Sequence, residues 1–337
     1  MAYNNVDTVS KNKLIVATLD FVQEDKFKSW YYFLSTFLLM VMAFVGTYLI
    51  TIVVGKIFCS ILAGLLTARM FVIYHDFHHE AILRRSKVAK FIMTIFGILT
   101  LAPASIWDES HQHHHNHNSK FSKVVIGSFP TITTNTYRTY TQAQRFWYLL
   151  IRHPFMIVFA YVPIFLVSFC LWPFFENPKK YFDCGLAALI HGFIIWALCY
   201  WGGWPVLLCT LIVPAIIMFA VGGYIFYAQH NFSEVILKDD DEWDYLDAAL
   251  YSSSFIKMNR IMRWFTANIG YHHIHHVNSR IPFYRLPEAM NQLTELQNPR
   301  CTSLHPKEIW KCIHLKLWDE EQGRMISLRE FRRTEKE

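Results

Sequence analysis

The stretch WYYFLSTFLLMVMAFVGTYLITIVV, residues 30–54, contains no charged side chain in 25 residues. A helix rises about 1.5 Å per residue, so this stretch is long enough to cross a hydrocarbon layer of roughly 30 Å. A second apolar stretch, residues 57–74, follows after only Gly55 and Lys56. We therefore predict two membrane helices that form a hairpin, with Gly55 in the turn.

Three more apolar stretches follow the hairpin, at residues 91–107, 155–172 and 184–227 of a 337-residue chain that is 53% hydrophobic. The last stretch is interrupted by WGGWP at residues 201–205, which predicts a break into two helices. No repeat or flexible linker separates these stretches, so we predict one all-α integral membrane domain over residues 1–337. Its predicted parts are an N-terminal cytoplasmic segment (1–28), the hairpin (30–76), a histidine-rich segment (108–118), further membrane helices (155–230) and a cytoplasmic cap (231–337).

Basic residues predict the orientation of the chain in the membrane. They gather beside three histidine-rich segments, for example at Arg84, Lys120 and Arg280, whereas Lys56 alone marks the opposite end of the hairpin. Because cytoplasmic loops carry an excess of Lys and Arg, the three segments are expected to face the cytoplasm.

Three segments on one side require an even number of membrane crossings between them. Residues 91–107 are interrupted by Pro103, so we expect them to lie along the membrane. Pro163 removes a backbone donor at the centre of residues 155–172, which are expected to cross incompletely. The prediction is therefore about four transmembrane helices plus membrane-surface helices.

Twelve of the 17 histidines lie in the three segments HDFHH (75–79), HQHHHNH (111–117) and HHIHH (272–276). Residues at positions i, i+3 and i+4 share one face of a helix. Each segment can therefore turn two or three imidazoles toward one point. The eight histidines with this spacing are His75, His79, His111, His114, His115, His272, His275 and His276.

Eight imidazoles are too many for one tetrahedral zinc ion, which takes three or four protein ligands. They fit two transition-metal ions, and imidazole ligation with exchangeable positions suits iron that reacts with dioxygen. Asp76, Asp108 and Glu109 adjoin these histidines and are candidates, together with water, to bind the second ring nitrogens.

The remaining histidines are weaker candidates for metal ligands. His78 also has an acceptable angle, so the choice between His78 and His79 stays open. His191 lies inside an apolar stretch, where a hydrogen-bonded packing role is expected. Three histidines fall on the far sides of their helices and are expected to stay outside the site: His113, His117 and His273.

Other features narrow the class of protein. From Pro306 onward, Trp310, Ile313 and Leu317 have helical spacing, which predicts a helix against the protein or the membrane face. Seven scattered cysteines without a CxxC pair argue against a disulfide framework or a zinc ribbon. The net charge of +6 is not accompanied by interleaved basic and aromatic residues, so basic loops near an anionic leaflet explain it better than a nucleic-acid partner.

The three segments HDFHH, HQHHH and HHIHH resemble the histidine boxes of membrane fatty acid desaturases. NIGYHHIHHVNSRIPFYRLP, residues 268–287, is similar to the third box and its sequel in acyl desaturases of the omega-6 or delta-12 type. The motifs RHP (152–154), QHNF (229–232) and KLWDEE (316–321) also resemble that group. The resemblance extends over residues 30–328.

The resemblance implies a non-haem di-iron centre at the membrane surface, which removes two hydrogens from an acyl chain with dioxygen and two external electrons. It implies His230 as a ninth ligand beside the eight named above. The acyl chain would arrive in the membrane on a lipid, on coenzyme A or on acyl carrier protein. The electrons would come from a separate ferredoxin or cytochrome b5, because no HPGG haem-binding motif is present.

Two other functions compete with desaturation. A hydroxylase or ketolase of an acyl, alkane or carotenoid substrate uses similar histidine boxes, but the NSRIPFYRLP tail favours desaturation. A membrane metal carrier would need ligating residues inside several helices, and here only Arg69 and His191 interrupt the apolar stretches as ionisable groups.

Overall fold

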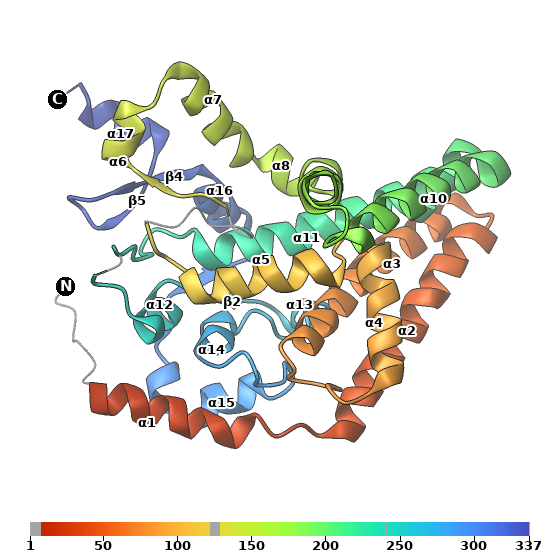
Figure 1. The fold of residues 1–337 in the computed structure, drawn as a ribbon, viewed down its shortest axis with the longest axis horizontal. Coiled ribbons are helices and arrows are strands. Elements are labelled where there is room, and N and C mark those ends of the chain that lie inside the picture. Colours follow the sequence, from red (N-terminus) through yellow and green to blue (C-terminus); the bar gives the residue numbers. More distant parts are fainter. Residues whose placement is uncertain (1–7, 122–128, 240, 337) are drawn as a thin grey trace.

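The computed structural model describes residues 8–121, 129–239 and 241–336. It is mostly helical, with the long apolar helices extending to the right of Figure 1 and the C-terminal part lying at upper left. The predicted N-terminal segment begins outside the described residues and continues as α1 (Thr8–Thr18) and the short 3₁₀ turn η1 (Leu19–Phe21).

The first two long helices form the predicted hairpin, α2 (Lys26–Leu49) and α3 (Val53–His78). The position predicted for the turn was wrong, because Gly55 lies in the first turn of α3. Ile50 and Ile52 adopt extended backbone conformations at the ends of the two helices. Three residues therefore reverse the chain without a glycine.

The third long segment consists of α10 (Phe182–Leu207), the π-helical turn η3 (Leu208–Ile212) and α11 (Val213–His230). The break predicted at WGGWP is confirmed at Gly203, whose φ of 67° and ψ of −173° are not helical. Asp183, in the first turn of α10, contacts Ser105, and His230 at the end of α11 packs against a histidine in the same helix as Ser105. Both ends of the segment thus lie on one side of the molecule, and the chain doubles back between them.

Among the described residues, three segments are long and apolar enough to cross a membrane: Lys26–Leu49, Val53–His78 and Phe182–His230. The bend at Gly203 divides the third, which gives the four apolar helices expected from the sequence. The predicted interruption of residues 91–107 is present as an 87° bend between α4 (Lys87–Leu99) and α5 (Ala104–His117).

Residues 155–172 form no long regular helix. They are divided among α8 (Pro154–Val158), the π-helix η2 (Tyr161–Leu171) and the start of α9 (Trp172–Glu176). Pro163 lies within the π-helix, in agreement with the missing backbone donor noted in the sequence.

Short elements complete the chain. The helices are α6 (Thr134–Thr139), α7 (Gln142–Ile151), α12 (Tyr245–Tyr251), α13 (Arg260–Phe265), α14 (His272–Val277), α15 (Leu286–Gln292), η4 (Thr294–Leu296), α16 (Pro306–His314) and α17 (Leu328–Thr334). Strands β1 (Ile132–Thr133), β4 (Leu315–Asp319) and β5 (Arg324–Ser327) form one sheet in the order β1-β4-β5, and β2 (Phe255–Lys257) pairs in parallel with β3 (Cys301–Ser303).

The C-terminal helix is shorter than its apolar spacing predicted. α16 begins at Pro306 as expected but ends at His314, and Leu317 lies in β4. Leu317 is fully buried and pairs with Ile132 on one side and Ile326 on the other. Pairing with two distant strands thus replaces the helical conformation there, and it adds a small sheet to the all-α prediction.

α3 is the central helix of the membrane part. Of its apolar window 56% is buried, against 28% for α2. A side-chain carbon at Gly64 would lie 2.7 Å from Ile217 Cβ and from the carbonyl oxygen of Pro214, so the glycine permits the close approach of α3 and α11. This contact brings the last turns of the two helices to the same part of the molecule.

Candidate metal centre

Four helices supply the predicted histidines. The last turn of α3 and the end of α11 approach the middle of the molecule, where α5 runs beside α11 and α14 lies next to α12 (Figure 1). Pro103 precedes α5 with an extended backbone, so the helix starts anew after the bend and points its histidines away from α4. α14 has six residues, all of them buried.

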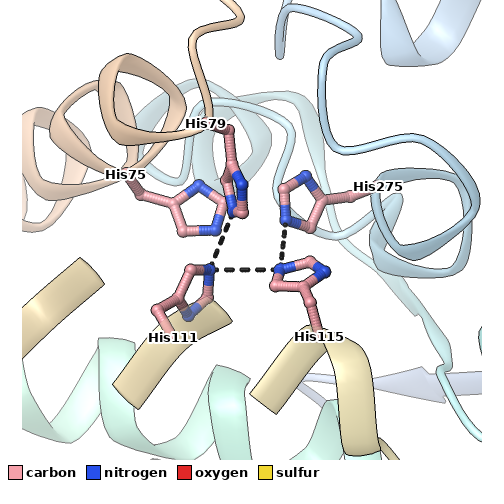
Figure 2. Close-up of side chains that lie close together, drawn as sticks. All are labelled: His75, His79, His111, His115 and His275. Carbon is pink, nitrogen blue, oxygen red and sulfur yellow. Dashed lines mark hydrogen bonds between the residues drawn. The ribbon is translucent and has the colours of Figure 1, made fainter. Parts of the chain in front are cut away.

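Five side chains form what we call the first histidine cluster: His75, His79, His111, His115 and His275. Figure 2 shows the rings turned toward one another, and one nitrogen of each lies within 4.8 Å of every other. His111 Nε2 lies 2.9 Å from His79 Nε2 and 3.1 Å from His115 Nε2, and the latter is 3.1 Å from His275 Nε2.

The other four predicted ligands form the second histidine cluster: His114, His230, His272 and His276. His272 Nε2 is 2.9 Å from His230 Nε2 and 3.0 Å from His276 Nε2. The two clusters are adjacent, because the rings of His115 and His276 stack with centroids 4.3 Å apart. The structure therefore brings all nine predicted histidines together, five in one group and four in the other.

The arrangement of the ring nitrogens suits metal coordination better than it suits hydrogen bonds between the imidazoles. A neutral imidazole has one N–H and one lone pair, so a single hydrogen on His111 Nε2 cannot serve both of its neighbours. Both ring nitrogens of His114 are buried without a hydrogen-bond partner among the described residues. A cation at the centre of each cluster would bind these lone pairs, and imidazole is a good ligand for iron, zinc, copper and nickel.

Burial also holds the imidazoles in the form that binds metals. It lowers the pKa values of His272, His275 and His276 well below the ordinary 6.5, and the neighbouring histidines lower them further. These rings are therefore neutral at pH 7. A neutral ring offers its lone pair to a metal without first releasing a proton.

The second ring nitrogens of two cluster histidines have partners. His75 Nδ1 donates to Asp76 Oδ1 (3.2 Å), and Asp76 Oδ2 accepts from the backbone of Phe283 (2.7 Å). His230 Nδ1 donates to the carbonyl of Ser252 (3.1 Å). Asp76 thus connects the first histidine box (75–79) to the sequence PFY (282–284), which follows the third box (272–276). The sequence did not predict the Ser252 contact, because a backbone carbonyl leaves no signal in residue type.

The other two candidate carboxylates do not touch the clusters. Asp108 pairs with His78 Nδ1. Glu109 accepts from Lys180 Nζ (2.7 Å) and from the Tyr181 hydroxyl (2.8 Å). These two residues therefore hold α5 against its surroundings.

The structure places the two alternative ligands of the first box differently. His79 lies in the first cluster, whereas His78 lies outside both clusters. We expect His79→Gln to lose bound metal, since an amide is a poor substitute for imidazole, and His78→Gln to keep the wild-type metal content. Elemental analysis of the two purified variants checks this. Loss of metal from the His78 variant with retention in the His79 variant would reverse the assignment.

The remaining histidines occupy the positions that the helical spacing suggested. His117 Nδ1 contacts the carbonyl of His113, and His273 Nε2 contacts the carbonyl of Leu296. His191 bonds to the Tyr161 hydroxyl (2.7 Å) and the Leu99 carbonyl (3.1 Å), which agrees with the packing role predicted for it.

An apolar cavity of about 400 Å³ opens onto the two clusters. His75 and His111 of the first cluster and His272 of the second form part of its wall. The rest is mainly apolar and comes from α3, α5, α8, η2 and α11, including Phe71, Trp107, Phe165, Phe219 and Phe226. The sequence analysis identified none of these residues, because apolar side chains in membrane helices are usually lipid-facing or packed. One available signal was Gly222 on α11, where the missing side chain leaves open space at the cavity.

A second cavity, of about 780 Å³, reaches the second cluster at His114 and His230. Its wall carries charged side chains, among them Lys120, Arg152 and Glu242. Phe129 and Phe226 contribute to both cavities. The two histidine clusters are thus approached by an apolar cavity and by a charged one.

The comparisons with known proteins agree with this arrangement. The family model for fatty acid desaturases matches residues 51–307. A fatty acid desaturase of Bacillus subtilis (strain 168) is 31% identical over 270 residues, which cover 80% of this chain and 76% of that protein.

More distant relatives carry more specific names. An sn-1 acyl-lipid omega-3 desaturase (ferredoxin) of Nostoc sp. (strain 36) is 24% identical over 299 residues. The matched region covers 85% of this chain and 80% of that protein. An sn-1 oleoyl-lipid 12-desaturase of Anabaena variabilis is 20% identical, and the matched region covers 70% of this chain and 67% of that protein. With its apolar helices, its paired histidine clusters and the match over most of its length, the chain belongs to the fatty acid desaturase family.

Proposed function

We propose that the protein is a dioxygen-dependent acyl-chain desaturase with two iron ions, one in each histidine cluster, and that it forms a delta-12 or omega-6 double bond. The observation that carries this proposal is an apolar cavity whose wall includes histidines of both clusters. An acyl chain in this cavity would lie against both metal sites at once.

The substrate dictates the need for metal chemistry. An alkyl carbon–hydrogen bond offers no acidic proton and no electrophilic atom, so side-chain acids and bases cannot break it. Bound iron supplies the activation of dioxygen that this reaction requires. Two hydrogens, which carry two protons and two electrons, would leave the chain. The donor would supply two more electrons and the solvent two more protons, so that dioxygen is reduced to two water molecules.

The residues of the chain hold the substrate and the ligands in place. Aromatic side chains of the cavity exclude water, and Trp107 stacks on His111 with ring centroids 4.9 Å apart. Asp76 fixes the ring of His75, and the Ser252 carbonyl fixes that of His230. Such fixation matters because a displacement of about 1 Å can change the rate on the order of 100-fold.

Similarity to known desaturases supports the proposed double-bond position and acyl carrier. The sequence NSRIPFYRLP is similar to that of delta-12 desaturases, and the Anabaena relative is named a 12-desaturase. The names of two relatives specify acyl lipids, which favours a membrane lipid over coenzyme A or acyl carrier protein as the carrier.

The experiment that tests the function is expression in a host that makes only saturated and monounsaturated lipids, followed by analysis of fatty acid methyl esters. A diunsaturated ester with its new double bond at position 12 is the expected product. A hydroxy ester would show that the chain is a hydroxylase on the same scaffold. No new product, in cells that contain the folded protein and a competent donor, would contradict the proposal.

The metal-carrier alternative has little support among the described residues. A carrier needs ligating groups inside its membrane helices. Arg69 instead packs on the Trp264 ring at 4.2 Å and donates to Thr36 Oγ1, and His191 is bonded to Tyr161 and to a carbonyl.

We also propose that the histidine clusters face the cytoplasm and receive electrons from an acidic partner, a ferredoxin or a cytochrome b5. Basic residues near the boxes would attract such a partner. Raising the ionic strength from 0.01 M to 0.15 M shortens the Debye length from about 30 Å to about 8 Å. We therefore expect the rate of reduction by the donor to fall several-fold over this range in stopped-flow measurements. A rate independent of salt would exclude charge-steered docking.

A further inference from the structure

A basic groove of about 530 Å³ lies next to the connection between α3 and α4 and contains no cluster histidine. Three segments distant in sequence line it: the start of α2 and the residues before it, the α3–α4 connection, and the chain after α14. Its four basic residues are Lys26, Arg84, Arg85 and Arg280. Its two acidic residues are Glu24 and Glu80.

The protein neutralises the positive charges of the groove only in part. All four basic side chains belong to exposed residues, and none forms an ion pair within the described part of the chain. Glu24 is already engaged, because its Oε1 accepts from the backbone N–H of Leu83 (2.6 Å). Four cations against two carboxylates leave a formal charge of +2, which favours an anionic ligand.

The backbone of the groove is fixed. Leu83 and Glu80 have left-handed conformations, with φ values of 50° and 55°, and make a tight turn between the two helices. Residues 81–83 are buried, and the Glu24 bond ties them to the segment before α2. Ser86 then caps α4 by accepting from the backbone of Ala89 (3.1 Å). Arg84 and Arg85 therefore extend from an ordered turn.

The groove lies where the apolar surface begins. Lys26 is the first residue of α2, the first of the candidate membrane-spanning helices, and Trp30, one turn later, also lines the groove. On α4, the side chains of Val88, Phe91, Ile95 and Leu99 repeat at helical spacing and are 41% to 67% exposed. Exposed apolar side chains beside Trp and basic residues are typical of the boundary between lipid tails and headgroups.

We propose that this groove binds the phosphate of an anionic phospholipid from the leaflet on the side of the histidine clusters. Arg84, Arg85 and Arg280 would hold the phosphate, and the acyl tails would lie along the exposed faces of α4 and α2. Guanidinium groups suit a phosphate because they donate two parallel hydrogen bonds. The lipid would fix the depth of the α3–α4 turn in the membrane. This inference does not depend on the identity or number of the metal ions.

The test is a lipid-binding measurement with two charge-matched variants. The groove variant is R84Q/R85Q/R280Q. The control variant, R329Q/R332Q/K336Q, removes three exposed basic residues from the C-terminal end, at the far corner of the molecule (Figure 1). The full chain is placed in phosphatidylcholine nanodiscs, phosphatidylglycerol is titrated in, and bound lipid is counted by native mass spectrometry.

We expect the wild type and the control to retain one phosphatidylglycerol per chain. Each basic residue near the surface contributes roughly a fivefold increase in affinity for anionic lipid, so the groove variant should bind about 100-fold more weakly. Phosphatidylcholine binding should not change. Metal content and the thermal midpoint show whether the groove variant is folded. If it is not, the single variant R280Q serves, with an expected loss of roughly fivefold.

Several outcomes would overturn the proposal. Equal weakening in both triple variants would show a diffuse effect of net charge. A wild type that does not prefer phosphatidylglycerol to phosphatidylcholine would exclude an anionic-lipid site. Full displacement by micromolar inorganic phosphate would indicate a site for the free ion. A groove variant that keeps its lipid but loses reduction by the electron donor would assign the groove to that protein instead.

Discussion

Replacing His275 by alanine is expected to leave about one metal ion per chain in place of two and to lower desaturation at least ~100-fold. His275 is buried, and its Nε2 faces His115 Nε2 in the first cluster. Loss of a residue that merely orients a metal ligand typically costs 10- to 100-fold in affinity or activity, so loss of a ligand should cost more. The second cluster keeps its four histidines in this variant.

The matched control is His273→Ala. His273 belongs to the same short helix and is equally buried, but it bonds to the Leu296 carbonyl and takes no part in either cluster. Its loss should cost about 1 to 3 kcal/mol of stability through the unpaired carbonyl, with two metal ions retained. Elemental analysis and product formation are measured for both variants. Equal metal loss in the two would show that α14 tolerates no substitution and would remove the argument for His275 as a ligand.

Filling the apolar cavity should strongly lower desaturase activity without removing metal. Gly222 lines the cavity, and a side-chain carbon added there would have no heavy atom within 4 Å. Gly222→Leu can therefore be accommodated by the backbone while its side chain occupies space needed by the acyl chain. We expect a decrease in desaturation on the order of 100-fold, the size of effect that follows from a displacement of about 1 Å at the reacting carbons.

Gly192→Leu provides the comparison for this variant. Gly192 also has open space around it, but it lies on α10 and does not line the cavity. Activity and metal content should both remain near wild type. Product analysis by fatty acid methyl esters checks the pair. Undiminished activity of Gly222→Leu on all chain lengths would show that the substrate does not occupy this cavity.

The histidine groups were predictable because their spacing is local. Positions i, i+3 and i+4 on one helix face identified His111, His114 and His115 as a set before any packing was known. That pattern could not show how the set is divided. In the structure His111 and His115 point to the first cluster and His114 to the second. The division depends on where α3, α11 and α14 lie around α5, which is a tertiary property.

The wrong or missing predictions also concern features that depend on tertiary structure. A glycine was expected in the hairpin turn, but the turn consists of residues 50–52, in which Ile50 and Ile52 have extended backbones. No local sequence signal indicated a turn at this position. Leu317 had helical spacing with Trp310 and Ile313, yet it is held in β4 by strands near residues 132 and 326. The apolar cavity was not predicted because its wall combines elements from α3 to α14, most of which are far apart in sequence.

The most direct test of the account is the iron content of the wild-type chain. The protein, purified without metal, is titrated anaerobically with ferrous iron, and bound iron per chain is determined by elemental analysis after removal of the excess. The account predicts saturation at two iron ions per chain, with nitrogen as the main ligand atom in X-ray absorption spectra. Saturation at one ion or none in a folded, lipid-embedded protein would contradict the proposal that the two histidine clusters form a di-iron centre.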